Sequence, residues 1–289
     1  MLLKRAAITL ATAVVLVGAS MATGSPSQAK GNAQSQANEN ALRDARNAEI
    51  IAYQDAHPDD LVGLDALARK YTGRGVKVAF SGTNGTLNAS QAQAHLKAWQ
   101  ASKTSSPQVK AAATPVGMVK PMALPNDTFA VWIVQTPLMG PPAQWRYNGR
   151  WDFKDTFAGQ SSPVDVASLS FDMPSCMRMV GHSISTFSVT GTNTYLGSLR
   201  SANVAAKAPI WNIADRTSGF QNLADRGSAG VTVQKYCTES TQVGADFAYE
   251  FNQGGGLFSV TAGWGLLEVS YTGSDQHLQK GTAPIYDVF

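Results

Sequence analysis

Two carboxylates near the C-terminal end of the chain have the residue type and spacing for hydrolytic chemistry. Glu250 and Glu268 fall on two expected strands, which span residues 246–252 and 257–271. The glycine-rich turn at 253–256 would make these strands neighbours and could bring both carboxylates to one face. Two carboxyl groups held about 5–9 Å apart across a cleft hydrolyse glycosidic bonds. This pair is the first catalytic candidate, and the alternative is a set of charges on the solvent face of a sheet.

A serine and a histidine form the second catalytic candidate. The segment Gly181-His-Ser-Ile-Ser185 resembles the G-x-S-x-G nucleophile elbow of α/β-hydrolases, with Ser185 in place of the last glycine. The triad order of that fold would make His277 the base for Ser183. An elbow also needs a helix after the serine, whereas residues 186–190 are β-branched and alternate. A Ser/Thr-rich strand is therefore the competing interpretation.

The other motifs predict neither a metal site nor a cofactor. The 4 histidines are scattered, and none lies at a metal-ligand spacing from another ligand. The glycines at 254–256 precede an expected strand, so they offer no helix N-terminus to an anion. Catalysis, if any, would depend on the serine or the carboxylates alone.

Aromatic residues dominate the segment Gln144–Phe153. Its central Asn148-Gly149 pair favours a type I′ turn, so we expect a hairpin there. The hairpin would place aromatic rings on both of its faces, and a face that does not pack inward could contact a ligand. Core packing is the alternative. The predicted ligand-binding residues are Trp145, Tyr147, Trp151 and Trp264.

The first twenty-nine residues read as a secretory signal. Lys4 and Arg5 precede an apolar stretch, residues 6–17, and Ser27-Gln28-Ala29 supplies small residues for cleavage before Lys30. The apolar stretch is short for a membrane span, so we expect no membrane anchor in the mature chain. The sequence thus predicts a secreted, extracellular protein.

Composition and cysteines agree with export. The formal net charge is +3 with 15% charged residues, so no strong field favours nucleic acid as a partner. Cys176 and Cys237 are the 2 cysteines of the chain, and exported thiols usually pair. We therefore expect a disulfide between them.

Periodicity divides the chain into segments. Residues 30–38 are polar and predicted to be disordered. Helical patterns cover much of 41–105, a Pro/Ala-rich stretch at 106–126 reads as a linker, and strand patterns fill 127–289. We expect a mainly β protein: an antiparallel β-sandwich or barrel-like domain after a small helical N-terminal segment, 30–105, which could be a removable pro-segment.

The functional expectation is a non-enzymatic protein that presents aromatic residues to a polysaccharide or another cell-surface ligand. It rests on the weak catalytic motifs together with the aromatic hairpin. The alternative is a secreted hydrolase, of the paired-carboxylate glycosidase type or, less favoured, a serine esterase. The sequence leaves the ligand and the oligomeric state open.

Overall fold

The computed structural model describes residues 26–105, 127–155, 164–202, 205–214, 216–218, 221–252, 256–272 and 277–288. The chain divides into two compact units, Met1–Leu42 and Arg43–Phe289. In the first unit, the side chains from Ala33 to Leu42 on helix α1 are all exposed. Two β-sheets and the helices that cover them belong to the second unit.

Three helices precede most of the strands: α1 (Pro26–Ala56), α2 (Leu61–Thr72) and α3 (Ala89–Ser105). Residues at the ends of α2 have the types that favour these positions, since Asp60 Oδ1 accepts from Gly63 N at 2.8 Å and Gly73 ends α2 in the left-handed conformation. Asn88 and Gln91 form the reciprocal capping box of α3. The predicted disorder of 30–38 is wrong, because α1 extends through these residues from its packed C-terminal half.

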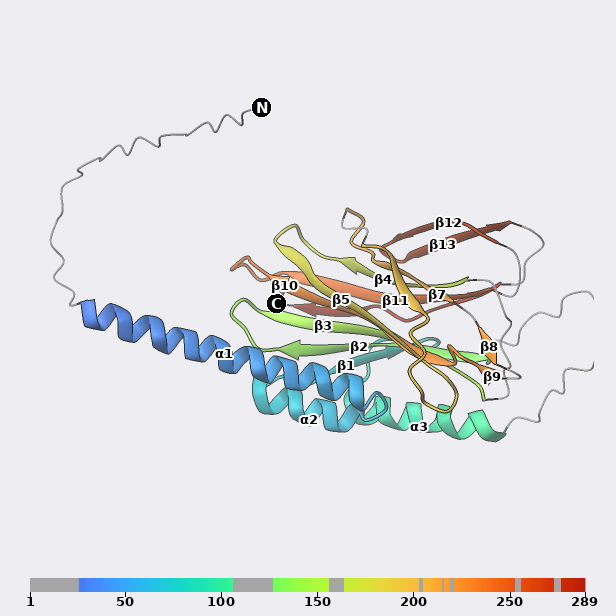
Figure 1. Ribbon diagram of the computed structural model, residues 1–289, viewed down its shortest axis with the longest axis horizontal. Helices are drawn as coiled ribbons and strands as arrows, with labels where there is room; N and C mark the ends of the chain where they lie inside the picture. Colours follow the sequence, from blue (N-terminus) through green and yellow to red (C-terminus); the bar gives the residue numbers. More distant parts are fainter. Residues whose placement is uncertain are drawn as a thin grey trace, which may run out of the picture. The chain divides into compact units, whose positions relative to one another are not determined.

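Two antiparallel sheets pack face to face, as the fold prediction expected (Figure 1). The first sheet has the order β1 (Lys77–Phe80), β2 (Phe129–Leu138), β3 (Gln144–Phe153), β10 (Arg226–Lys235) and β5 (Met177–Phe187). The second has the order β14 (His277–Gly281), β11 (Gln242–Asn252), β4 (Val164–Asp172), β7 (Ile210–Ala214) and β6 (Gly197–Ser201), with β15 (Ile285–Val288) also on β11. The largest apolar core lies between these sheets.

The predicted hairpin at Asn148-Gly149 is wrong. Strand β3 continues through both residues, which pair with Val134 and Ile133 of β2. Gly149 lies against the Phe247 ring of the second sheet, since an added Cβ would be 2.0 Å from Phe247 Cδ2. Pairing with β2 and β10 on either side, together with this close approach, outweighs the local preference for a turn.

The helices cover the outer face of the first sheet. Ile50, Leu61 and Leu96 belong to a second apolar cluster with Trp132 and Val134 of β2. Residues 77–80 add strand β1 to the edge of this sheet beside β2. The segment before the Pro-rich stretch therefore contributes both a strand and a packed helical layer to the β-sandwich.

A separate hairpin covers the outer face of the second sheet. Strands β12 (Gly256–Gly263) and β13 (Leu266–Thr272) pair with each other and turn at Trp264-Gly265, within the single strand predicted for 257–271. Ala262 and Leu267 pack on Val166 and Ile210. Figure 1 shows this hairpin and helices α2 and α3 on opposite sides of the sandwich. A short pair, β8 (Thr217–Ser218) and β9 (Gln221–Asn222), completes the strands.

Cys176 and Cys237 form the predicted disulfide, with their Cα atoms 5.5 Å apart. The bridge joins the chain just before β5 to the chain just after β10, which are paired neighbours in the first sheet. None of the helices in the described part of the chain is long and apolar enough to cross a membrane.

Candidate functional site

Most of the predicted aromatic ligand-binding residues are buried, which corrects that prediction. Trp145, Tyr147 and Trp151 are 3%, 0% and 0% exposed and pack in the core between the sheets. Because β3 does not turn, its odd-numbered residues all face the second sheet. Trp264 alone of the predicted set is exposed, at 36%.

The strands that carry Glu250 and Glu268 are not paired neighbours, contrary to the expectation from the glycine-rich turn. Strand β11, which carries Glu250, pairs with β4, β14 and β15 rather than with β12. Glu250 is buried on the outer face of the second sheet, and burial raises its pKa to about 7. Glu268 is exposed, while its neighbours Leu267 and Val269 pack toward the sheet. Glu268 therefore lies on the face of the β12–β13 hairpin that is turned away from the second sheet.

Ser183 and His277 also lie apart. Ser183 is on β5, which contacts β6 at one edge of the sandwich, whereas His277 begins β14 at the opposite edge of the second sheet. No helix follows Ser183, because β5 continues to Phe187. Ser183 instead accepts a hydrogen bond from Arg146 Nη2 at 2.6 Å. The geometry required of a nucleophile elbow is absent from this described strand.

A groove of about 510 Å³ lies on the outer face of the second sheet, beside the turn of the β12–β13 hairpin. We call it the Trp264 groove. Its lining combines aromatic, acidic, amide and hydroxyl side chains, chiefly Trp264, Tyr286, Asp246, Gln279, Ser170 and Thr282. A concave site with apolar walls and a few placed polar groups is the usual form of a ligand site.

Two exposed rings form one wall of the Trp264 groove. Trp264 and Tyr286 meet edge to face, with ring centroids 6.0 Å apart, and Tyr286 is 47% exposed. The Trp264 ring lies over Gly244, where an added Cβ would be 2.5 Å from its Cη2 atom. A glycine at this position of β11 thus lets the indole approach the sheet backbone.

Asp246 holds the hairpin turn against the sheet. Its Oδ2 accepts from Gly265 N at 3.0 Å, and its Oδ1 accepts from the Ser170 hydroxyl. Burial raises the pKa of Asp246, and these two hydrogen bonds oppose the rise. Gly265 has a φ of 66°, so the turn uses the left-handed region that glycine allows. Asp246 therefore fixes where Trp264 is presented.

A second pocket, of about 170 Å³, lies between the corner that joins α1 to α2 and the outer face of the first sheet. We call it the Arg150 pocket. Even-numbered residues of β3 face this side, because the odd-numbered ones face the core. Its lining residues include Asp55, Asp59, Trp132, Arg150, Asp152 and Arg226.

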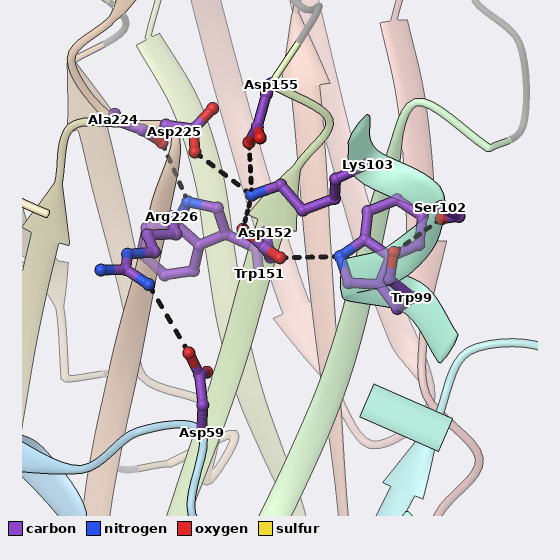
Figure 2. A network of polar contacts seen from close by, with 10 residues as sticks. All are labelled: Asp59, Trp99, Ser102, Lys103, Trp151, Asp152, Asp155, Ala224, Asp225 and Arg226. Carbon is purple, nitrogen blue, oxygen red and sulfur yellow. Dashed lines mark hydrogen bonds and ion pairs between the residues drawn. The ribbon is translucent and has the colours of Figure 1, made fainter. Parts of the chain in front are cut away.

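An ion-pair network borders the Arg150 pocket (Figure 2). Lys103 Nζ, from α3, lies 2.8 Å from Asp152 Oδ1, 3.0 Å from Asp155 Oδ1 and 3.7 Å from Asp225 Oδ2. Trp99 Nε1 donates to Asp152 Oδ2 at 2.7 Å. The network ties the C-terminal end of α3 to β3 and to the start of β10.

Burial and charge act in opposite directions within this network. Burial raises the pKa of Asp225 to about 7 and also raises that of Asp152, while the Lys103 charge opposes both shifts. Burial alone would lower the pKa of Lys103, but the charge and hydrogen bond of Asp152, with Asp225, raise it overall. Lys103 therefore remains an ammonium that balances buried carboxylates.

The predicted turn concealed the sequence signal for the sheet side of the Arg150 pocket. Arg146, Arg150 and Asp152 alternate with the aromatic residues of β3, a pattern that a two-residue turn would have broken. Treating 144–153 as one strand would have separated a polar face from an aromatic one. The residues that α1 and α2 add to the pocket depend on tertiary packing.

No family model matches this chain, and no curated protein matches it. Solved structures overlap weakly. The major pilin subunit of Bacillus cereus has 9% identity over 51% of this chain and 35% of its own, with a TM-score of 0.29. A collagen-binding domain from a Staphylococcus aureus adhesin has 6% identity over 53% of this chain and 93% of that domain, with a TM-score of 0.27. Clostridium perfringens delta-toxin has 9% identity over 57% of this chain and 85% of the toxin chain, with a TM-score of 0.24.

This chain spans about a third of the length of the pilin subunit. Overlaps with TM-scores of 0.24–0.29 establish neither the fold nor the function of this chain. The fold follows from the strand pairing and the core described above.

Proposed function

We propose that this chain is a secreted, non-enzymatic binding protein that takes a glycan of a cell surface or cell wall in the Trp264 groove. The observation that carries the proposal is the pair of exposed rings, Trp264 and Tyr286, on the wall of a groove of about 510 Å³. Large flat rings with a polar edge provide contact area at low entropic cost, and sugars expose both apolar faces and hydroxyls.

The polar groups of the groove suit a ligand rich in hydroxyls. Thr282 Oγ1 accepts from Phe247 N at 3.1 Å, so its own hydrogen can be donated to a ligand. The Asp246 oxygens already accept from Gly265 N and the Ser170 hydroxyl, and each has a further lone pair for a ligand donor. Gln279 Nε2 donates to Leu267 O at 2.6 Å, which orients the amide beside the groove. The ligand would bind through ring contact supported by a few directed hydrogen bonds.

Two features of the chain favour export, which the proposal requires. Residues 1–29 have the pattern of a cleavable signal, and the Cys176–Cys237 disulfide is a feature of proteins that mature in oxidising compartments. A groove with exposed aromatic rings would then meet polymers outside the cell. Glu250 and Glu268 lie on strands that do not pair with each other, and Glu268 is on the hairpin face turned away from the sheet, which argues against the glycosidase alternative.

A depletion experiment tests this function. The mature chain is mixed with insoluble polysaccharides and cell walls, and both protein loss from solution and released sugars are measured. We expect depletion without release, and we expect Trp264→Ala and Tyr286→Ala each to weaken depletion at least ten-fold. Tyr195→Ala is the matched control, because Tyr195 is 84% exposed and is not part of the groove lining.

Three results would contradict the proposal. The absence of depletion by every polymer would reject glycan binding. Equal depletion by the wild type and Trp264→Ala would reject this groove as the site. Sugar release that disappears in Glu250→Gln would favour a hydrolase. Far-UV circular dichroism of each variant shows whether the fold is retained.

A further inference from the structure

One charged side chain lines the Trp264 groove, and its hydrogen-bond partners are all neutral. The lining residues include Asp246 but no lysine, arginine or histidine. Asp246 accepts from Gly265 N and from the Ser170 hydroxyl. Burial raises the pKa of Asp246, and no positive charge among the described residues contributes to lowering it. The groove therefore has a carboxylate whose charge the protein does not compensate locally.

The Asp246 carboxylate is accessible from the groove. Ala245 and Phe247 belong to the core between the sheets, so Asp246, between them on β11, points to the outer face. It is partly exposed, and its contact with Gly265 lies at the surface. Each oxygen accepts one hydrogen bond and keeps a lone pair for a further donor. A ligand in the groove can use these lone pairs.

The two exposed rings are neighbours of this carboxylate. Gly244 and Asp246 are two residues apart on β11, so they share the outer face at a spacing of about 7 Å. The Trp264 ring covers Gly244, and Tyr286 is the cross-strand partner of Gly244. Trp264 also directly precedes Gly265, whose N–H donates to Asp246. The indole and the carboxylate are thus held by the same turn.

A second carboxylate adds negative charge to this face. Asp172 of β4 pairs with Gly244 on the side opposite Tyr286, and it is exposed. Cross-strand partners point to the same face of a sheet, so Asp172 and Asp246 both lie on the outer face. With no basic residue in the groove lining, these charges favour a cationic ligand and disfavour an anionic one.

On the basis of the proposed function, we propose that the Trp264 groove binds a glycan that carries free amino groups. The protonated amine of a sugar unit donates to Asp246, and the sugar ring lies against Trp264. An ammonium close to an aromatic face is attracted by the ring as well. The polar groups of Gln279 and Thr282 serve the hydroxyl groups of the same glycan. Acetylation of the amine removes its charge and therefore this contact.

Depletion by a matched pair of polymers tests the inference on the full mature chain. Chitin and insoluble, cross-linked chitosan have the same backbone, but most amines are acetylated in chitin and free in chitosan. At pH 6 we expect at least ten-fold higher affinity for chitosan than for chitin, and weaker binding to pectate, a polyanion, than to either. The chain has a formal net charge of +3, so nonspecific attraction would favour pectate instead.

Asp246→Asn tests the contact itself. Asparagine can accept from Gly265 N through its oxygen and donate to the Ser170 hydroxyl through its amide, so the turn keeps both contacts while the charge is lost. We expect about ten-fold lower affinity for chitosan, as for one hydrogen bond to a charged group, and unchanged affinity for chitin. The matched control is Glu268→Gln, which removes an exposed carboxylate of the same hairpin outside the groove lining. It should bind both polymers as the wild type does.

Three results would overturn the inference. The first is an affinity for chitin equal to or above that for chitosan, and the second is tighter binding to pectate than to chitosan. The third is an equal loss for chitin and chitosan in Asp246→Asn, which would limit Asp246 to holding the turn. In all three cases, polymer binding that Trp264→Ala weakens would still support the proposed function. The absence of depletion by every polymer would instead reject both.

Discussion

Lys103 Nζ lies 2.8 Å from Asp152 Oδ1, and this pair joins the end of α3 to the outer face of the first sheet. The side chains are 12% and 8% exposed, and Asp155 and Asp225 complete the network around the ammonium. Since burial disfavours both charges, the pair is maintained by mutual attraction and by the Trp99 hydrogen bond. Removing one partner leaves the other as an uncompensated buried charge.

We therefore expect Lys103→Met to lower the free energy of unfolding by about 3 kcal/mol at pH 8. The loss should be smaller at pH 5, because the pKa values of Asp152 and Asp225 are already raised and these groups protonate more readily without Lys103. Urea denaturation at the two pH values measures the difference. Lys97→Met, an exposed lysine on the same helix, is the control. An equal loss at both pH values would contradict the charge argument.

Glu250 should make stability depend on pH. Burial raises its pKa from 4.5 to about 7, so the folded state binds a proton more tightly than the unfolded state does. The stabilising contribution is fully present below pH 4.5 and is lost as the pH rises through about 7. The loss amounts to about 3 kcal/mol. Glu250→Gln should reduce the slope of the unfolding free energy plotted against pH over this interval. An unchanged slope would contradict the raised pKa of Glu250.

A side chain at position 149 should destabilise the fold. The Cβ of an alanine at this position would lie 2.0 Å from the Phe247 ring. Gly149→Ala would therefore push the sheets apart or shift the ring. We expect a loss of about 2 kcal/mol in the free energy of unfolding, measured by urea denaturation. Gly181→Ala is the matched control, because nothing lies within 4 Å of its added Cβ and it is also in a strand of the first sheet. Equal stabilities would refute the close approach.

Gly244 should control ligand binding through the position of Trp264. Gly244→Ala adds a methyl group 2.5 Å from Trp264 Cη2 and so displaces the indole without removing it. We expect polysaccharide depletion to fall about ten-fold, comparable to one lost aromatic contact of about 1.4 kcal/mol. Gly263→Ala, on the same hairpin with no atom within 4 Å of the added Cβ, should bind as the wild type does. Retained depletion by Gly244→Ala would argue against this ring position.

The disulfide should contribute strongly to stability. It closes a loop with a sequence separation of 61, for which the chain-entropy relation gives about 4 kcal/mol. Replacing Cys176 and Cys237 together by serine should lower the unfolding free energy by about this amount, as measured by chemical denaturation. A double variant as stable as the wild type, or free thiols in protein secreted under oxidising conditions, would contradict a structural role for the bridge.

The proposed removal of residues 30–105 as a pro-segment remains a prediction. Cleavage would take away β1 and the cover over Trp132 and Val134, which are 3% and 1% exposed in the intact chain. We would then expect exposed apolar surface and an unpaired edge on β2. Mass spectrometry of the secreted protein identifies its first residue and decides this directly.

Local signals in the sequence indicated both ends of α2, the start of α3, most of the strands and a mainly β, antiparallel fold. Asp60, Gly73 and the Asn88–Gln91 box act within a few residues of their own position, so no tertiary contact is needed to recognise them. The pairing of Cys176 with Cys237 followed from their number and the expected compartment.

Tertiary structure alone decided the candidate sites. Asn148-Gly149 has the composition of a turn, yet pairing on both sides of β3 and the Phe247 ring over Gly149 keep the strand straight. That one outcome buried Trp151 in the core and turned Arg150 toward the helices. The exposure of Trp264 likewise depends on how β12 and β13 lie over a distant strand. Such contacts join residues far apart in the chain, so their energies are not encoded in any short segment.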